Sequence, residues 1–281
     1  MSQCAVTGAA GFVGGEITRH LAANGWCVLH LGRRQPPSGE AFCSYNLLGD
    51  PEALPWGEID ALVHCAWDLG LKEWAAIERV NVQGSIRLLQ AARAHGVPRI
   101  VFISSFSSFA GCRSLYGRAK MLVEAEATRL GVTIVRPGLV YGDRSGSIVG
   151  LMEKAVQSLP VLPLIGDGSY PQYPVHVQDV AELVLRICSA PEAFHEKPLS
   201  AAPSDRVSFR QILERIAART GRRLWCVPVP WRLIDAGLRV IELLRVPFPF
   251  RRDSLTGIVF QNPHPDFALP PALAVEFRRF Q

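Results

Sequence analysis

The stretch Thr7-Gly8-Ala9-Ala10-Gly11-Phe12-Val13-Gly14 decides the fold of this chain. It joins a short apolar run at residues 3–7 to a segment with helical spacing at residues 12–24. A strand, a turn spaced G-x-x-G-x-x-G and a helix in this order are typical of a dinucleotide-binding site. Gly8 permits the tight turn, Gly11 lets the backbone approach a pyrophosphate, and Gly14 allows the helix to pack closely on the sheet. The free N–H groups at the start of the helix then favour phosphates.

The rest of the first half repeats this alternation of strand and helix. Apolar runs with strand character lie at residues 26–31, 61–65, 100–104 and 132–135, and helical periodicity lies at residues 73–95 and 115–130. Parallel strands joined by helices form right-handed crossovers, which place helices on both faces of the sheet. We therefore predict an α/β fold, a Rossmann-type doubly wound parallel sheet.

The pattern changes after about residue 140. Prolines become frequent, and helices are predicted at residues 179–188, 209–220 and 231–244 without regular core strands between them. We expect residues 1–140 to form the nucleotide-binding core, completed by returns near residues 175–202. Residues 141–281 are expected to form mainly a smaller C-terminal lobe that binds the substrate.

Composition excludes several classes of protein. The 281 residues are 48% hydrophobic, which is enough for a core and excludes intrinsic disorder. The net charge of +5 is spread along the chain, so nucleic acid is not an expected partner. Seven scattered cysteines favour a reducing compartment, and seven histidines lack metal-ligand spacing. We expect a cytoplasmic protein with no signal peptide, no transmembrane segment and no metal.

The end of the second predicted strand bears on the choice of cofactor. NAD sites place an acid there to hold the ribose 2′-hydroxyl. Here the position is Gly32, and Arg33 and Arg34 follow it. Guanidinium groups bind phosphate well, so we predict NADP, with the 2′-phosphate on Arg33 and Arg34. The alternative is a pair of solvated loop arginines, in which case NAD is the cofactor.

A second group of polar residues follows the strand at residues 100–104. Ser104 and Ser105 lie at its end, on the sheet edge where α/β proteins bind ligands. Tyr116 and Lys120 are four residues apart and therefore share one helical face. Y-x-x-x-K alone is common by chance, but it is specific when combined with the glycine turn and a serine at a strand end.

These motifs together resemble the extended short-chain dehydrogenase/reductase superfamily, and more narrowly its NAD-dependent epimerase/dehydratase family. The resemblance covers roughly residues 3–190. Further stretches match family motifs in order: DALVHCA at 60–66 (D-x-x-x-H-x-A), NL at 46–47 (usually DL), NVQG at 81–84 (N-V-x-G), RPGLVYG at 136–142 (R-P-G-x-x-Y-G) and VHVQDV at 175–180 (V-H-V-x-D-V).

The resemblance implies a role for each of three side chains. Tyr116 is the general acid or base at a substrate carbinol or carbonyl. Lys120, with the nicotinamide, lowers the pKa of that phenol and holds the nicotinamide ribose. Ser105, which matches the second serine of the family's pair and is preferred over Ser104 and Ser107, bonds the substrate oxygen.

Other positions are expected to surround the cofactor or to be structural. We interpret His64 and His176 as structural residues in apolar runs. By resemblance, the helices at 73–95 and 115–130 imply a homodimer. Cofactor contacts are expected from Gly8, Ala10, Gly11, Phe12, Val13, Gly14, Arg33, Arg34, Asn46, Leu47, Cys65, Ala66, Trp67, Asn81, Ser104, Tyr116, Lys120, Pro137, Gly138 and Val140.

Three departures from the family pattern bear on the substrate. Nucleotide-sugar members usually carry Asn where this chain has Leu139, and often Arg where it has Gln172, which weakens the case for a nucleotide sugar. Sugar dehydratases follow their catalytic Ser or Thr with Asp-Glu, but here Phe106 and Ser107 follow Ser105, which disfavours dehydration.

We therefore predict an NAD(P)-dependent oxidoreductase or epimerase that transfers hydride at a carbinol or carbonyl carbon of a small molecule, with a sugar or nucleotide sugar among the candidates. The alternative is a non-catalytic NADP(H)-binding sensor or scaffold. The segment 231–252 mixes aliphatic residues with arginines. It is interpreted as a lid helix whose arginines face solvent or an anionic substrate, or as a basic amphipathic helix on a membrane surface.

Overall fold

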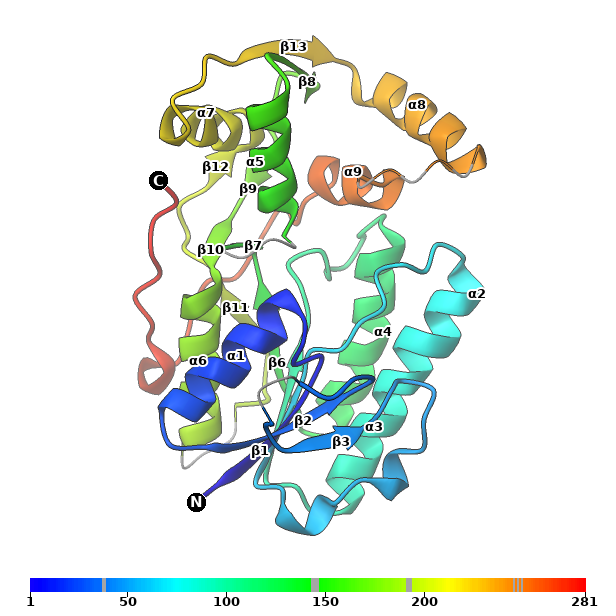
Figure 1. Ribbon diagram of the computed structural model, residues 1–281, viewed down its shortest axis with the longest axis vertical. Coiled ribbons are helices and arrows are strands. Elements are labelled where there is room, and N and C mark those ends of the chain that lie inside the picture. The colour runs from blue at the N-terminus through cyan, green and yellow to red at the C-terminus, as the bar shows by residue number, and fades with distance from the viewer. Residues whose placement is uncertain (37–38, 143–146, 191–193, 245, 247, 249) are drawn as a thin grey trace.

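The computed structural model describes residues 1–36, 39–142, 147–190, 194–244, 246, 248 and 250–281, and its centre is a seven-stranded parallel sheet (Figure 1). The strand order is β11-β6-β5-β4-β1-β2-β3. The strands are β1 (Gln3–Thr7), β2 (Cys27–Gly32), β3 (Phe42–Ser44), β4 (Ala61–His64), β5 (Arg99–Ile103), β6 (Thr133–Pro137) and β11 (Leu199–Ala201). The prediction of an α/β fold with a doubly wound parallel sheet is confirmed.

Helices cover both faces of this sheet. The helices α1 (Phe12–Ala23) and α6 (Val177–Ser189) pack together on one face, and α3 (Gln83–Ala94) and α4 (Leu115–Arg129) pack on the other (Figure 1). Strands that are covered on both faces bury every side chain, which is why β4 reads as an unbroken apolar run ending in a histidine. The carboxyl ends of the strands therefore form an edge that is open to ligands.

The single helix predicted at residues 73–95 is wrong in detail. The chain forms α2 (Trp74–Ile77), a π-helical turn (Glu78–Val82) and then α3. A π-turn adds residues without breaking the helical path, so the 3.6-residue periodicity persists across it. The turn places Asn81 against the loop that follows β4.

A third hydrophobic cluster belongs to the second half of the chain. Its small sheets pair β7 (Leu139–Tyr141) with β10 (Pro174–His176), β9 (Pro171–Gln172) with β12 (Val207–Ser208), and β8 (Val161–Ile165) with β13 (Trp225–Val229). Its helices are α5 (Ile148–Ser158), α7 (Phe209–Arg219), α8 (Trp231–Leu243) and α9 (Arg252–Val259). The sequence did not reveal these strands, because they contain two to five residues each and several include proline.

The basic segment at 231–252 is not one continuous helix, because α8 and α9 are separate. Arg245 lies outside the described residues. Arg252 pairs with Asp235 at 2.8 Å, and Arg251 donates hydrogen bonds to carbonyl oxygens of the loop at 69–71. These two arginines therefore tie segments together and are not free to face a substrate. Among the described residues, no helix is both long and apolar enough to cross a membrane.

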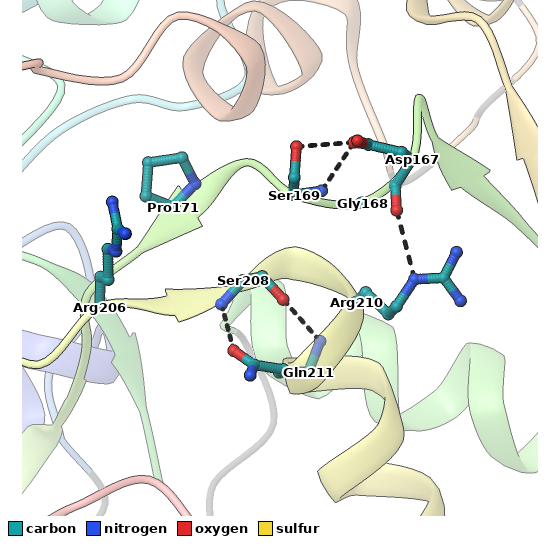
Figure 2. Close-up of a pocket in the computed structure, with 8 residues that line it drawn as sticks. All are labelled: Asp167, Gly168, Ser169, Pro171, Arg206, Ser208, Arg210 and Gln211. Atoms are coloured by element: carbon teal, nitrogen blue, oxygen red, sulfur yellow. Dashed lines mark hydrogen bonds between the residues drawn. The ribbon is translucent and has the colours of Figure 1, made fainter.

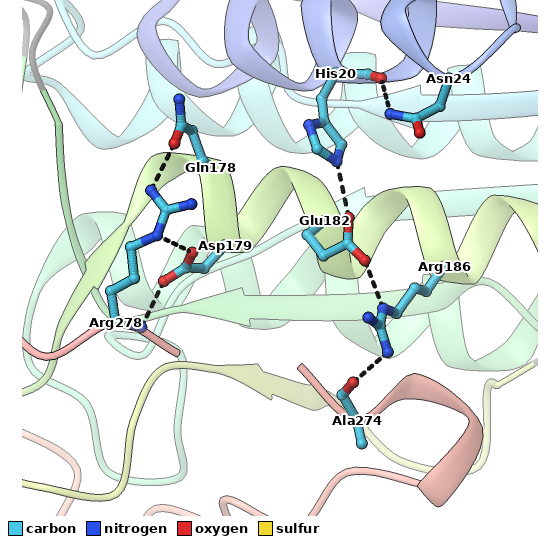
Figure 3. Close-up of polar contacts among 8 residues, drawn as sticks. All are labelled: His20, Asn24, Gln178, Asp179, Glu182, Arg186, Ala274 and Arg278. Carbon is cyan, nitrogen blue, oxygen red and sulfur yellow. Dashed lines mark hydrogen bonds and ion pairs between the residues drawn. The ribbon is translucent and has the colours of Figure 1, made fainter. Parts of the chain in front are cut away.

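The C-terminal tail crosses back to α6, which covers one face of the seven-stranded sheet. Arg278 donates its backbone N–H to Asp179 on α6 at 2.8 Å, and its guanidinium lies 3.2 Å from the same carboxylate (Figure 3). One turn further along α6, Glu182 contacts His20 of α1 at 2.9 Å. The acid of the V-H-V-x-D-V motif thus holds the tail of the chain, so its role is structural.

Candidate active site

The glycine turn after β1 has the geometry that a dinucleotide requires. Gly8 has φ +69°, and a Cβ there would lie 2.9 Å from the backbone nitrogen of Ala66. A Cβ on Gly14 would lie 2.3 Å from the carbonyl oxygen of Gly8, so only glycine lets α1 start this close to the turn. No side chain caps Gly11 at the start of α1, and the first turn carries no acid. The open N–H groups suit a pyrophosphate, so the residues present fit the cofactor.

A buried hydrogen-bond chain holds this turn in place. The hydroxyl of Thr7 accepts the backbone N–H groups of Cys65 and Ala66 at 3.1 Å, so its own proton must go to Nδ1 of His64 at 2.7 Å. Nε2 of His64 then carries the ring proton and donates to Ser85 at 2.8 Å. Burial lowers the pKa of His64 to about 3, so the ring is neutral. The geometry gives His64 the structural role that the sequence predicts.

The two serines that follow β5 point to different partners. Ser105 shares a hydrogen bond with Tyr116 and accepts the backbone N–H of Ser107. Ser104 is buried and donates to Glu124 at 2.5 Å. Of the two, Ser105 therefore lies beside the phenol, whereas the expected contact of Ser104 with the cofactor would have to come from its backbone.

Glu124 is the centre of a buried ion pair that the sequence interpretation missed. Arg136 donates to both of its carboxylate oxygens, at 2.9 and 2.5 Å. Together with Ser104, these residues join α4 to β5 and β6 and so fix the helix that carries Tyr116 and Lys120. Arg136 is 12 residues from Glu124 and Ser104 is 20 residues from it, so no helical spacing points to these contacts.

Lys120 is buried beside Trp67, the residue expected next to the cofactor. Its Nζ donates to the carbonyl oxygen of Ile103 at 2.7 Å and lies 3.8 Å from the ring centre of Trp67. The ring of Trp67 also meets that of Tyr116 edge-on at 5.9 Å. Burial lowers the pKa of Lys120 to about 7. The indole thus contacts both the ammonium and the phenol.

The phenol of Tyr116 does not show the lowered pKa that we expected from Lys120. Burial raises its pKa to about 12, the hydrogen bond with Ser105 opposes this, and the charge of Asp253 adds to it. The expectation was drawn for the cofactor-bound enzyme, in which a positive nicotinamide contributes. The protein by itself favours the neutral phenol, the form that donates a proton.

Asp253 is a second residue that the sequence did not reveal. It lies on α9, and its carboxylate accepts the backbone N–H groups of Leu115 at 2.6 Å and Tyr116 at 3.0 Å. Ser114 caps the next N–H of the same helix, that of Gly117, at 3.0 Å. The first turn of α4 is therefore held by the C-terminal half of the chain. Asp253 is 137 residues from Tyr116, so no local spacing points to it.

Asn81 and Leu47, two residues expected to contact the cofactor, are held by contacts with backbone atoms. The carboxamide of Asn81 accepts the N–H of Asp68 at 2.8 Å and donates to its carbonyl at 3.0 Å. Both ends of this side chain are therefore engaged, and it sets the loop after β4. Leu47 is buried, and a Cβ on Gly84 would lie 2.2 Å from its carbonyl oxygen, which explains the glycine of N-V-x-G.

The adenosine end of the expected site is exposed. Arg33 and Arg34 directly follow β2, both are exposed, and neither makes an ion pair within the described part of the chain. Asn46 is also exposed, and its side-chain oxygen accepts the N–H of Leu48 at 2.9 Å. Ala10, exposed, and Phe12 and Val13, half-buried, lie on the glycine turn and the start of α1.

Pro137, Gly138 and Val140 lead from the core sheet to the second half of the chain. The carbonyl of Pro137 accepts the N–H of Phe106 at 3.0 Å, and Val140 pairs with Val175 between β7 and β10. A Cβ on Gly138 would lie 2.1 Å from the backbone oxygen of Tyr173, so this crossing requires glycine.

Leu139 and Gln172, the two departures from the family pattern that bear on a nucleotide-sugar substrate, have different surroundings in the structure. Leu139 packs against the third hydrophobic cluster. Gln172 is buried, with its carbonyl oxygen 3.3 Å from Gln261 and its Nε2 without a hydrogen-bond partner. The side-chain amide of Gln172 is therefore a free hydrogen-bond donor at the position where nucleotide-sugar members often carry arginine. His176 caps α6 by accepting the N–H of Gln178 at 3.3 Å, which agrees with a structural role.

A separate open cleft of about 640 Å³ lies between β9 and the start of α7 (Figure 2). Arg210 donates across one end of it to the carbonyl of Asp167 at 3.2 Å. Its lining residues are Asp167, Gly168, Ser169, Pro171, Arg206, Ser208, Arg210 and Gln211. It includes none of the residues expected to be catalytic or to bind the cofactor.

Comparison with known proteins identifies the class of enzyme. Residues 4–200 match the NAD dependent epimerase/dehydratase family. Ceramide reductase of Caulobacter vibrioides is 32% identical over 66% of this chain, and the match spans 61% of that protein. A dTDP-4-dehydro-6-deoxy-D-allose reductase from a Streptomyces species is 27% identical over 86% of this chain and 88% of its own. The solved structure of MoeE5 in complex with UDP-glucuronic acid and NAD is 24% identical, has a TM-score of 0.69 and covers 82% of this chain and 86% of that one.

The fold and the glycine turn define a dinucleotide-binding α/β enzyme of the short-chain dehydrogenase/reductase type. The chain belongs to the NAD-dependent epimerase/dehydratase family. It is an NAD-dependent enzyme that transfers hydride at a carbinol or carbonyl carbon, and the alternative of a non-catalytic sensor or scaffold is not supported.

Proposed function

We propose that this enzyme is a reductase that converts a ketone to a secondary alcohol, with Tyr116 as the proton donor. The observation that carries the proposal is the position of Tyr116, which is hydrogen-bonded to Ser105 and lies against the indole that also contacts Lys120. When bound, the reduced nicotinamide supplies the hydride. The neutral phenol supplies the proton to the developing alkoxide, and Ser105 stabilises the charge on that oxygen.

Reduction is favoured over epimerisation and dehydration. The residue after Ser105 is a buried phenylalanine, so no carboxylate follows it to remove water from a sugar. Two of the relatives named above are reductases. A reductase releases its cofactor after each turnover, which agrees with an exposed adenosine end.

We propose NADPH as the preferred reductant. Gly32 leaves the second strand without an acid, and Arg33 and Arg34 are exposed beside it. Since neither guanidinium is used in an ion pair among the described residues, both are available to a 2′-phosphate. NADH remains the alternative, because NAD accompanies MoeE5 and is named for the family.

The substrate is proposed to be a ketone without a nucleoside diphosphate. Leu139 offers that group no polar contact and Gln172 offers an amide in place of a charged arginine, and the match to ceramide reductase makes a keto form of ceramide the first compound to test. The second candidate is a nucleotide-linked 4-keto sugar, because the match to the dTDP-sugar reductase covers more of both chains.

The deciding experiment follows oxidation of NADPH with a keto form of ceramide and with a dTDP-4-keto-6-deoxyhexose. We expect turnover with one of these ketones, lowered about 10²- to 10⁴-fold in Tyr116→Phe. Tyr173→Phe is the matched control: it removes the hydroxyl of a half-buried tyrosine whose ring packs against Phe106 and Phe267, and it is expected to keep its activity. Interconversion of sugars without net consumption of NADPH would instead establish an epimerase. Equal rates in Tyr116→Phe and the wild type would exclude the proposed proton donor.

Further proposals concern organisation and location. We propose that residues 1–140, completed near 175–202, bind the cofactor, and that most of residues 141–281 form the substrate lobe. A homodimer through α3 and α4 and a cytoplasmic location are also proposed. The location is supported by seven cysteines that are all free thiols.

A further inference from the structure

The helix α8 has two apolar faces, although only one is needed for packing. Its inner face places Leu238 in the third hydrophobic cluster, with Ile234 and Ile241 packed against it. Its outer face exposes Leu233, Val240 and Leu243 with fractions of 64%, 55% and 82%. The outer residues recur at intervals of seven and three positions, so they form one stripe along the helix.

The charged residues of α8 lie together along one edge of the outer stripe, since Arg239 and Asp235 are an i,i+4 pair. The acids of α8 are turned toward α9, where Asp235 pairs with Arg252 at 2.8 Å and Glu242 accepts the backbone N–H of Arg252 at 3.3 Å. The arginines are exposed. Arg232 lies over the ring of Trp231 at 5.7 Å, and Arg239 is 3.5 Å from Asp235 while its side chain remains 67% exposed. The outer face is therefore apolar, with two exposed arginines along one of its edges.

A second copy of the chain is a poor match for this surface. A symmetric contact joins the same patch on two molecules, and here it would bring the exposed arginines of both copies to one small area. An anionic bilayer offers the opposite charge together with an apolar interior. Leucine and valine on one side and arginine at its margins are typical of helices that lie in the membrane interface.

The position of α8 suits a peripheral contact. The helix lies at the edge of the molecule, next to α9 (Figure 1). The ion pair between Asp235 and Arg252 joins it to α9, and Asp253 of α9 holds the first turn of the helix that carries Tyr116. A contact at α8 is thus linked to the candidate active site through Arg252 and Asp253, two adjacent residues of α9.

We infer that the outer face of α8 docks on an anionic lipid bilayer, with Leu233, Val240 and Leu243 in the acyl boundary and Arg232 and Arg239 at the headgroups. This docking does not depend on the proposed reduction, because binding is measured without turnover.

The test measures flotation of the full chain with vesicles of phosphatidylcholine, with and without phosphatidylglycerol. We expect binding to the anionic vesicles that weakens as salt rises. The triple variant Leu233→Ser, Val240→Ser, Leu243→Ser should lose binding. Arg232→Gln and Arg239→Gln should each weaken it roughly fivefold. All five side chains are exposed, so thermal unfolding should be nearly unchanged.

Two control variants separate a specific face from general surface properties. Arg222→Gln with Arg223→Gln removes two exposed charges from another part of the same half, and Leu48→Ser with Leu159→Ser removes two exposed leucines elsewhere. Both should bind as the wild type does. Equal losses in the controls, equal binding in the triple variant or no binding by the wild type would each overturn the inference. Self-association that the triple variant abolishes, without vesicle binding, would assign the face to a second copy.

Discussion

Asp253 holds the backbone of Tyr116: its carboxylate accepts the N–H of Tyr116 at 3.0 Å and that of Leu115 at 2.6 Å. The negative charge stabilises the start of α4, where the helix dipole is positive, and it also raises the pKa of the Tyr116 phenol. One residue of the C-terminal half therefore influences both the position and the acidity of the proposed proton donor.

Replacement of Asp253 by Asn should move the pH dependence of catalysis. Loss of the negative charge lowers the pKa of Tyr116, so alcohol oxidation, which needs the phenolate, should rise at lower pH than in the wild type. Measurement of kcat/KM against pH for oxidation of the alcohol product tests this. Asp266→Asn, which removes an exposed partner of Lys197, is the control and should leave the profile in place. An unshifted profile in Asp253→Asn would mean that the carboxylate acts on structure alone.

Arg33 and Arg34 should determine the preference for NADPH. A lost charged hydrogen bond to the 2′-phosphate costs about 1.5–3 kcal/mol, which raises KM for NADPH by roughly tenfold or more in Arg33→Ala or Arg34→Ala. KM for NADH should hardly change, since NADH lacks that phosphate. Steady-state kinetics with both cofactors provide the measurement, with Arg222→Ala as the control. Wild-type preference for NADH would contradict the argument.

His64 should make the stability of the protein depend on pH. Burial lowers its pKa to about 3 in the folded protein, against 6.5 ordinarily. Between these values the unfolded chain binds a proton that the folded protein does not. Stability from this group is therefore complete above pH 6.5 and falls as the pH drops toward 3, by up to about 1.4 kcal/mol per pH unit.

Urea unfolding across this pH range measures the effect. His64→Gln should show a shallower dependence than the wild type, although it is less stable at neutral pH. His95→Gln, which changes an exposed histidine paired with Glu52, should keep the wild-type slope. If all three slopes coincide, the buried neutral imidazole is not the source of the dependence.

Glu124 should contribute far more to stability than its neighbour on the same helix. Glu124→Ala leaves Arg136 without its bidentate partner and Ser104 without an acceptor, and we expect a loss of about 3 kcal/mol in the free energy of unfolding. Glu126→Ala removes a pair with the exposed Arg129 and should cost under about 1 kcal/mol. Similar losses of stability in the two variants would show that the Glu124–Arg136 pair contributes no more than the Glu126–Arg129 pair.

Gly14 should be intolerant of even one added methyl group. The Cβ of Gly14→Ala would lie 2.3 Å from the carbonyl oxygen of Gly8, so the turn must move. We expect a loss of about 1–3 kcal/mol in stability and weaker cofactor binding in fluorescence titration. Gly237→Ala, on α8 with no atom within 4 Å of the new Cβ, should instead gain about 0.5–1 kcal/mol. Unchanged cofactor affinity in Gly14→Ala would contradict the expected role of the turn.

The sequence predicted the sheet well and the second half of the chain poorly. Apolar runs of four to six residues between helical segments correspond to β1, β2, β4, β5 and β6. Parallel strands that are covered on both faces are apolar at every position, so they are easy to see in the sequence as continuous apolar runs. The strands of the second half are two to five residues long, and their pairing partners lie far away in the chain. Periodicity within a short window cannot detect such elements.

By itself the sequence determined five of the seven strands of the sheet, the glycine turn and the spacing of Tyr116 and Lys120, because each depends on residues a few positions apart. Tertiary structure alone decided which side chains meet: Asp253 reaches the start of α4 from another part of the chain, and Trp67 comes to lie against Lys120. These contacts join segments that are far apart in the sequence, so no local spacing of residues could predict them. Local geometry thus determines the class of this enzyme, and long-range packing determines how its candidate active site is held.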